Sequence, residues 1–184
     1  MVVKSPITGI PAKRIKTYDS AILVEEYRNN YDIDVSSYFN NHDTFHKYQC
    51  SITGYQFFYP FEIAGDGAFY EKLQQFEWYY LPAKWEHTVA MKYIQENSSV
   101  LEIGCATGNF LRNLEKRFNK LDLIGIDLNE KAIAETKQQG IVAINTTIES
   151  HAKTIKNEYD VVCAFQLLEH IDTVSSFLTS AITT

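Results

Sequence analysis

The stretch Val100-Leu101-Glu102-Ile103-Gly104-Cys105-Ala106-Thr107-Gly108-Asn109-Phe110 decides the fold. It begins as a short apolar strand, VLEIG (100–104), and continues into NFLRNLEKRF (109–118), whose pattern predicts a helix. Gly104 and Gly108 stand between them, where a backbone must pass close to a ligand and can aim free N–H groups at it. The stretch therefore predicts a strand, a ligand-binding turn and a helix.

Apolar runs and amphipathic stretches alternate beyond this turn. LDLIGIDL (121–128), IVAIN (141–145) and YDVVCAF (159–165) predict strands, and NEKAIAETKQQ (129–139) predicts a helix with Gly140 as its C-cap. Alternation at this spacing gives a parallel sheet with right-handed crossovers. We therefore expect an α/β fold with a Rossmann-like parallel sheet, of which the sequence supplies four strands.

A carboxylate ends the second of these strands. Asp127 stands 19 residues after Gly108, where it can accept hydrogen bonds from both hydroxyls of a ribose. Glu102, two residues before Gly104, would repel a pyrophosphate. It suits a ligand with a cationic end, such as the amino group and sulfonium of S-adenosylmethionine. The turn also lacks the G-x-G-x-x-G spacing of a dinucleotide site, which disfavours an NAD-dependent oxidoreductase.

These motifs together resemble a class I S-adenosylmethionine-dependent methyltransferase of the small-molecule type, similar to the ubiquinone-biosynthesis O-methyltransferases. The resemblance covers about residues 83–180 and rests on Glu-x-Gly-x-x-x-Gly from Glu102, on Gly125-Ile126-Asp127, and on Tyr159-Asp160-Val161-Val162 with Leu168-Glu169-His170. It implies S-adenosyl-L-methionine as cofactor and methyl transfer to an oxygen, nitrogen or carbon atom of a small-molecule acceptor.

The resemblance also implies roles for individual residues. Cofactor contacts would come from the turn, from the ribose acid and its neighbour, from the segment flanking the adenine, and from the end of the fourth strand: Glu102, Gly104, Cys105, Gly108, Asp127, Leu128, Thr147, Ile148, Glu149, Phe165 and Gln166. Cys105 and Cys163 are interpreted as small core residues and not as nucleophiles.

Two further positions carry open questions. Glu169 and His170 stand where the family often places groups that face the substrate, so His170 is a candidate general base. The alternative is that they only cap a helix or order its loop. Ala106 departs from the family, which usually has a glycine there, and a positive φ at this residue would cost roughly 1 kcal/mol.

Two segments of the N-terminal region have similar sequences. Ser5-Pro6-Ile7-Thr8-Gly9 and Cys50-Ser51-Ile52-Thr53-Gly54 share an Ile-Thr-Gly ending, and they resemble the two Cys-x-x-Cys-Gly knuckles of a zinc ribbon. Only Cys50 of the four ligand positions is a cysteine, so we expect no metal, with hydroxyl-to-backbone hydrogen bonds holding the turns. Two unrelated turns that share a tripeptide are the alternative.

Three parts are expected along the chain. Residues 1–65 form a degenerate zinc-ribbon-like region in which AILV (21–24) and YQFFY (55–59) predict strands. Residues 66–97 form a helical linker or lid, and residues 98–184 form the incomplete cofactor-binding domain. In the linker, one helix begins at Asp66, carries Phe69, Leu73, Phe76 and Tyr80 on one face, and stops at Pro82. A second carries Val89, Tyr93 and Ile94.

The amino-acid composition argues against some classes of binding partner. A net charge of −6 without a basic stripe argues against nucleic acid, and no apolar run reaches the length of a membrane span. Three widely spaced cysteines indicate a reducing, cytoplasmic location without disulfides.

The sheet itself looks unfinished, because a full class I methyltransferase has seven strands. The fourth strand would then be an exposed, hydrophobic edge through which a homodimer can form. We therefore expect a truncated chain, and the alternative function is a non-catalytic fragment that binds cofactor or a partner without methyl transfer.

Overall fold

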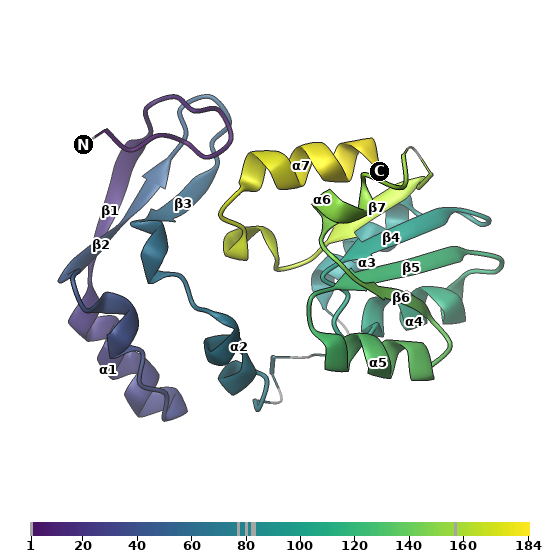
Figure 1. Ribbon diagram of the computed structural model, residues 1–184, viewed down its shortest axis with the longest axis horizontal. Coiled ribbons are helices and arrows are strands. Elements are labelled where there is room, and N and C mark those ends of the chain that lie inside the picture. The colour runs from purple at the N-terminus through teal and green to yellow at the C-terminus, as the bar shows by residue number, and fades with distance from the viewer. Residues whose placement is uncertain (1, 77, 80, 82–83, 157) are drawn as a thin grey trace. The chain divides into compact units, whose positions relative to one another are not determined.

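Two sheets, one in each of two units, organise the chain (Figure 1). The computed structural model describes residues 2–76, 78–79, 81, 84–156 and 158–184. Contacts within the chain separate Met1–Tyr80 from Leu81–Thr184, and each unit is described by itself. The three-part division expected from the sequence stays a prediction.

The second unit contains the parallel sheet, in the order β6-β5-β4-β7. Its strands begin and end within about two residues of the ranges that the sequence predicted, so the α/β, Rossmann-like prediction is confirmed. Its elements are α3 (Trp85–Ala90), η3 (Met91–Tyr93), β4 (Ser99–Ile103), α4 (Asn109–Arg117), β5 (Asp122–Asp127), α5 (Glu130–Gln138), β6 (Val142–Asn145), α6 (Ile148–His151), β7 (Val161–Ala164), η4 (Leu168–His170) and α7 (Val174–Thr183).

Helices cover both faces of this sheet (Figure 1). Successive residues of β4 point to opposite faces. Val100 packs with residues of α4 and α5, in a cluster that also includes Ile94 after η3. Leu101 and Ile103 pack on the other face with Phe177 of α7. The alternation puts Glu102, like Val100, on the face of α3, α4 and α5.

Asp160, which precedes β7, fixes the start of that strand to the start of β4. Its Oδ2 accepts hydrogen bonds from the backbone N–H of Ser99 at 2.8 Å and from the Ser99 hydroxyl at 3.0 Å. These hydrogen bonds lower the pKa of Asp160, so its role in the Tyr159-Asp160-Val161-Val162 motif is to align two strands of the sheet.

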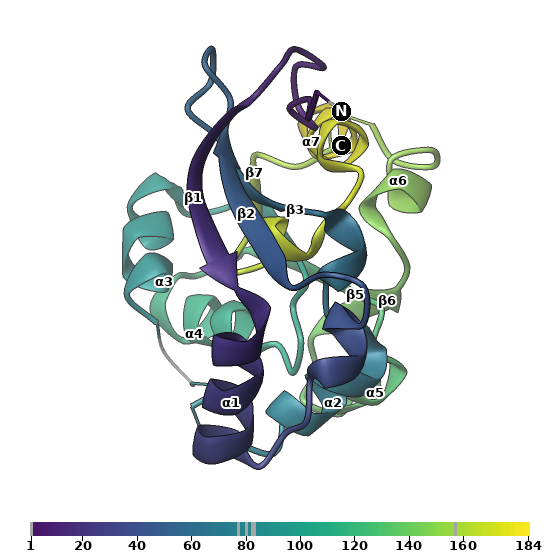
Figure 2. The ribbon, with the colours of Figure 1, turned by 90° about the vertical axis from the view of Figure 1, so that its left-hand side faces the viewer.

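The first unit contains a three-stranded antiparallel sheet in the order β1-β2-β3, and α1 continues from the end of β1 (Figure 2). An aromatic cluster lies among its helices, with Tyr27, Tyr38, Phe69 and Tyr79 packed around Ile33, Val35 and Leu73. Its elements are β1 (Lys13–Asp19), α1 (Ser20–Tyr31), η1 (Ser36–Phe39), β2 (Thr44–Gln49), β3 (Gln56–Tyr59), η2 (Phe61–Ile63) and α2 (Gly67–Leu73).

One predicted strand of this unit is wrong and one is confirmed. The run AILV (21–24) lies in helix α1, because Asp19 caps the helix by accepting a hydrogen bond from the N–H of Ala21 at 2.8 Å. Val24, Tyr27 and Tyr31 then follow at helical spacing and pack on the aromatic cluster. YQFFY (55–59) forms β3 as predicted.

The predicted helices after Asp66 are partly right. The predicted start at Asp66 is right within one residue, since Asp66 caps α2, which begins at Gly67. However, α2 ends at Leu73, and Tyr80 and Pro82 lie outside the described residues. The apolar stripe predicted for the next helix is wrong for Val89 and Tyr93, which are 40% and 72% exposed. The inward face is formed instead by His87, Ala90, Met91 and Ile94. None of the described helices has the length and apolar composition of a membrane span.

Candidate cofactor site

The turn after β4 is held against the end of β5. The backbone N–H groups of Gly104 and Cys105 both donate to the carbonyl of Ile126, at 2.8 and 3.1 Å. Gly104, Ala106 and Gly108 have φ values of 73°, 46° and 71°. The backbone therefore does place Ala106 in the left-handed region, which is the condition under which an alanine there costs stability.

Close packing adds a second requirement for glycine. A Cβ on Gly108 would lie 2.7 Å from Cγ2 of Thr136, a side chain with no exposed surface. A Cβ on Gly125 would lie 2.6 Å from Sγ of Cys105. The thiol of Cys105 thus fills the space beside β5, and burial raises its pKa well above the ordinary value. Burial also raises the pKa of Cys163 to about 12, so neither thiol is a ready nucleophile.

Asp127 joins the turn to β5 through both of its carboxylate oxygens. Oδ2 accepts the N–H of Ala106 and Oδ1 accepts the N–H of Asn129, each at 2.8 Å. A carboxylate oxygen can accept more than one hydrogen bond, so both oxygens retain capacity for a hydroxyl donor. Leu128 follows with 69% of its surface exposed.

Glu102 is a buried carboxylate in the centre of β4. It is 4% exposed, and none of the described residues forms a hydrogen bond with its Oε2. Burial raises its pKa well above the ordinary value, with the charge of Asp127 adding to this and that of Lys84 opposing it. An uncompensated buried carboxylate is costly, and a cationic group beside it would restore its charged form. The residues of the turn therefore fit the cationic end of S-adenosylmethionine.

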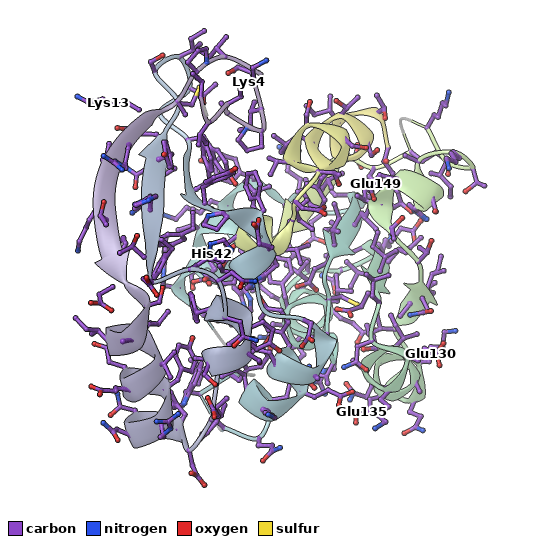
Figure 3. The ribbon with its side chains drawn as sticks, turned by 60° about the vertical axis from the view of Figure 1, so that its left-hand side comes forward. Lys4, Lys13, His42, Glu130, Glu135 and Glu149 are labelled. Atoms are coloured by element: carbon purple, nitrogen blue, oxygen red, sulfur yellow. The ribbon has the colours of Figure 1, made fainter. Side chains whose placement is uncertain are left out.

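The segment after β6 is ordered by its own hydrogen bonds. The Thr147 hydroxyl accepts the N–H of Ser150 at 3.2 Å and caps the short helix α6. The side chain of Ile148 is 2% exposed and packs in the core, so only its backbone is available to a ligand. Glu149 lies on α6 (Figure 3) and is half-buried.

The end of β7 contributes Phe165 and Gln166. The ring of Phe165 meets that of Phe110 edge to face at a centroid distance of 4.8 Å. Gln166 has a φ of 49°, and its Nε2 donates to Oε1 of Glu86 at 3.3 Å. The carboxyl end of β7 is thereby linked to the first turn of α3.

Glu169 and His170 follow on η4, and both are exposed. Surrounding protein atoms lower the pKa of His170 below its ordinary value of 6.5, while the charge of Glu169 acts in the opposite direction. The imidazole is therefore neutral near pH 7, which is the form that can accept a proton.

His87 is a residue of this site that sequence reasoning missed. It is 6% exposed, and its ring lies at a centroid distance of 4.9 Å from the rings of both Phe110 and Phe165. Its Nδ1 has no hydrogen-bond partner among the described residues. The spacing of His87, Ala90, Met91 and Ile94 (i, i+3, i+4, i+7) carried the signal, because it places a histidine on the inward face of α3.

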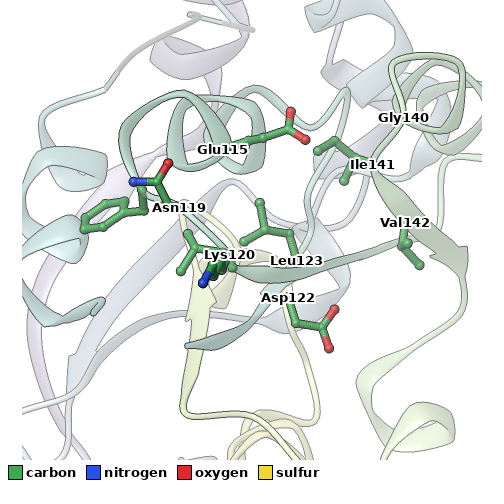
Figure 4. Close-up of a pocket in the computed structure, with 10 residues that line it drawn as sticks. Glu115, Asn119, Lys120, Asp122, Leu123, Gly140, Ile141 and Val142 are labelled. Atoms are coloured by element: carbon green, nitrogen blue, oxygen red, sulfur yellow. The ribbon is translucent and has the colours of Figure 1, made fainter. Parts of the chain in front are cut away.

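A pocket of about 400 Å³ lies at the opposite ends of the strands (Figure 4). It is lined by Glu115, by the residues that begin β5, and by Gly140, Ile141 and Val142 where β6 begins. Ligands of open α/β sheets bind at the carboxyl ends of the strands, so this pocket is separate from the candidate cofactor site.

In the first unit, the two Ile-Thr-Gly turns have the same backbone geometry. Ser5 N–H donates to the carbonyl of Ile10 at 2.8 Å, and Gly9 N–H donates to the carbonyl of Ser5 at 2.9 Å. The second turn has the same pair of hydrogen bonds. Cys50 N–H donates to the carbonyl of Tyr55 at 2.8 Å, and Gly54 N–H donates to the carbonyl of Cys50 at 3.0 Å. Gly9 and Gly54 have φ values of 70° and 72°.

Three of the four knuckle positions carry hydroxyl side chains, and these surround the sulfur of the fourth, Cys50. The three are Ser5, Thr8 and Thr53. Thr8 Oγ1 lies 3.4 Å from Sγ of Cys50. Hydrogen bonds from the hydroxyls of Ser5, Thr53 and Thr8 lower the pKa of Cys50 to about 6. In the described part of the chain, no three His, Cys, Asp or Glu side chains gather as a metal site would require.

Comparison with known proteins agrees with this geometry. Residues 77–184, more than half of the chain, match a family described as "Methyltransferase domain". The chain belongs to this methyltransferase family. A ubiquinone biosynthesis O-methyltransferase of Hydrogenovibrio crunogenus is 29% identical over 92 residues, which are 47% of this chain and 37% of that protein. One from Aliivibrio fischeri is 26% identical over 93 residues, covering 44% and 39%. The chain thus spans about two-fifths of the length of these relatives.

A solved structure shares the fold over most of the chain. The plantazolicin methyltransferase BamL, in complex with a triazolic desmethylPZN analog and SAH, aligns with 90% of this chain and 55% of its own at a TM-score of 0.51 and 19% identity. The prediction of a class I methyltransferase fold is therefore confirmed, and S-adenosyl-L-methionine, the predicted cofactor, agrees with these comparisons.

Proposed function

We propose that this chain binds S-adenosyl-L-methionine at the carboxyl ends of β4, β5, β6 and β7 and is the cofactor-binding part of a small-molecule methyltransferase. The observation that carries this is the buried Glu102 carboxylate with an unpartnered Oε2 beside the glycine turn. The cofactor supplies an electrophilic methyl group, which an oxygen, nitrogen or carbon atom of the acceptor attacks in line.

The chain's own residues bind and orient. Glu102 would pair with the amino group of the cofactor, and the positive φ values of Gly104 and Gly108 would let the backbone of the turn approach it closely. Asp127 accepts hydrogen bonds from the ribose hydroxyls with the capacity that its bonds to backbone N–H groups leave. Leu128 and the segment Thr147-Ile148-Glu149 flank the adenine. Holding the methyl group in a fixed place is the main catalytic contribution of such a site.

Phe165 and Gln166 line the cofactor, and Glu169 and His170 face the side from which the acceptor arrives. His170 takes the proton of an acceptor hydroxyl or amine, since its lowered pKa keeps the imidazole neutral near pH 7. In the methyltransferase that contains this chain, we expect His170→Gln to lower kcat while the dissociation constant of the cofactor stays the same. An unchanged kcat leaves His170 with a loop-ordering role only.

The homodimer predicted from the sequence belongs to this proposal as well. β7 is the last strand of the sheet in the order β6-β5-β4-β7, so its outer edge has no strand partner within the described residues. Unpaired edges favour pairing with another strand. A sedimentation equilibrium experiment showing only monomer at high concentration contradicts the dimer.

Calorimetric titration with S-adenosylhomocysteine tests the cofactor site. A charge-assisted hydrogen bond contributes about 1.5–3 kcal/mol, so Glu102→Gln should weaken binding roughly 10- to 100-fold. Glu135→Gln, on the outer face of α5 (Figure 3), is the matched control and should bind like the wild type. Binding should also release protons, because a cation lowers the raised pKa of Glu102. A well-folded chain that does not bind the ligand contradicts the proposal.

A further inference from the structure

A cavity of about 150 Å³ opens within the aromatic cluster of the first unit. Its wall is formed by α1, η1, η2 and α2 and by residues beside these helices: Tyr27, Val35, Tyr38, Phe39, Ile63, Gly65 and Phe69. A cavity of roughly this size can hold a molecule as large as benzene. Four of these lining residues are aromatic, so a ligand in this space would lie mainly against rings.

The rings stand at steep angles to one another around Phe69. The ring of Tyr27 makes an interplanar angle of 57° with that of Phe69 at a centroid distance of 5.6 Å, and the ring of Tyr38 makes one of 69° at 5.9 Å. Gly65 leaves room for the Phe69 ring, because a Cβ on Gly65 would overlap Cδ1 of Phe69. Rings that are not coplanar can face a common space, and the face of an aromatic ring carries partial negative charge.

A carboxylate adjoins these rings. Asp66 follows Gly65, and its Oδ1 accepts the hydroxyl of Tyr38 at 2.6 Å and the N–H of Phe69 at 3.0 Å. These hydrogen bonds lower the pKa of Asp66, so the carboxyl is ionised near neutral pH. A phenol that donates to a carboxylate has more electron density on its ring, which strengthens the attraction of a cation to the face of that ring.

The cavity wall has no positive charge to match this carboxylate. No Lys, Arg or His is among the described residues that line it. Arg28 is next to Tyr27 in the sequence, but its guanidinium forms an ion pair with Asp34 at 3.5 Å. Ring faces and an ionised carboxylate without a basic side chain fit a ligand that brings its own positive charge.

We propose that this cavity is an aromatic cage for the methylated ammonium group of a small molecule. The methyl groups of such a cation suit an apolar wall, while its charge is attracted to the ring faces and to the carboxylate of Asp66. All of these residues lie in the first unit, so the inference is independent of the cofactor site proposed for the second.

Two probes of the same shape test the cage. Choline carries a trimethylammonium group, and 3,3-dimethylbutan-1-ol has a neutral carbon in place of the nitrogen. In titrations of the intact chain, followed by the methyl proton resonance of each probe, choline should bind about tenfold more tightly. Its methyl resonance should move upfield, because ring faces shield nearby protons. Equal binding of the two probes, or binding of neither to the folded chain, overturns the proposal.

Asp66→Asn removes the charge and keeps the helix cap, because asparagine caps a helix as well as aspartate does. It should weaken binding of choline about tenfold and change binding of the alcohol less than about twofold. Asp19→Asn is the matched control, since Asp19 caps α1 in the same way, through the N–H of Ala21, which is not part of the cavity wall. Equal effects of the two substitutions on choline binding contradict the cage.

Phe69→Leu keeps an apolar side chain and removes the central ring. It should remove most of the preference for choline over the alcohol, and circular dichroism checks that the variant is folded. A folded Phe69→Leu chain that retains the full preference overturns the cage. Titration with S-adenosylhomocysteine should give the same result in wild type, Asp66→Asn and Phe69→Leu, so a failure of one proposal is distinguishable from a failure of the other.

Discussion

Each unit contains turns built on glycines with positive φ, but the two units use them differently. In the knuckles of the first unit, a Cβ on Gly9 would meet nothing within 4 Å and one on Gly54 only a side-chain atom at 4.0 Å. In the second unit, a Cβ on Gly108 would meet Thr136 at 2.7 Å. The knuckle positions require glycine only because φ is positive there. Position 108 requires glycine for the same reason and also because the side chain of Thr136 lies too close for a Cβ.

The two regions also differ in which atoms would bind a ligand. A knuckle binds metal through four side chains, and three of these are hydroxyls here, at Ser5, Thr8 and Thr53. The proposed cofactor turn depends on the course of its backbone, which is retained with Ala106 at a positive φ. Substitution can therefore remove a side-chain site while its backbone persists, and it removes a backbone site far less readily.

Restoring the missing thiolates should give the largest effect. If the knuckle backbone is intact, Ser5→Cys, Thr8→Cys and Thr53→Cys together should bind one zinc ion per chain with a free energy on the order of 10 kcal/mol. The three matching alanine substitutions are the control, and the wild type should hold no stoichiometric zinc. Metal content after dialysis against a chelator measures both. One zinc per wild-type chain, or none in a folded triple variant, contradicts the resemblance to a zinc ribbon.

Gly108→Ala should destabilise the second unit by about 2–4 kcal/mol, because backbone strain and a contact with the buried Thr136 add together. Gly140→Ala is the matched control. Gly140 has a φ of 86° and open space around its Cβ direction, so the strain alone should cost about 1 kcal/mol. Urea unfolding of both variants measures the difference. Equal losses would mean that Thr136 moves aside and that the turn is not tightly packed.

Cys50 gives the knuckle cluster a pH dependence of the opposite sign to that of the buried Glu102 and Cys105, whose pKa values are raised. Its pKa is lowered from 9.0 to about 6 in the folded chain by the hydroxyls around it. The thiolate therefore stabilises the fold fully above the unfolded pKa, and this contribution is lost as the pH falls from 9.0 towards 6. The difference in unfolding free energy between wild type and Cys50→Ser should grow between these pH values. A difference that does not change with pH contradicts a thiolate in the cluster.

The sequence predicted the parallel sheet well, because a strand buried on both faces, such as β4, is a continuous apolar run, and because α5 begins at a capping Asn129. The prediction was wrong at AILV (21–24), because four apolar residues fit a strand or a buried helix equally well. The hydrogen bond that Asp19 accepts at the start of α1 favours the helix. Of the candidate site, the glycine turn and Asp127 lie where motif spacing placed them. His87 lies outside any motif, since its place depends on how α3 packs against α4 and the end of β7.

Ala106→Gly should give the smallest change in the free energy of unfolding, and it tests whether the backbone at this position is strained. Its N–H donates to Asp127 and its carbonyl accepts the hydroxyl of Thr136 at 3.0 Å, so hydrogen bonds on both sides hold φ at 46°. Ala106→Gly removes strain of about 1–2 kcal/mol and adds about 0.4–1 kcal/mol of unfolded-state entropy, so the chain should become about 0.5 kcal/mol more stable.

Ala134→Gly, on the exposed side of α5, is the comparison and should destabilise the chain by about 1 kcal/mol. The same substitution should thus change the free energy of unfolding with opposite signs at the two positions. If Ala106→Gly destabilises as much as Ala134→Gly does, the turn carries no strain, and the tolerance of the backbone site to substitution needs another explanation.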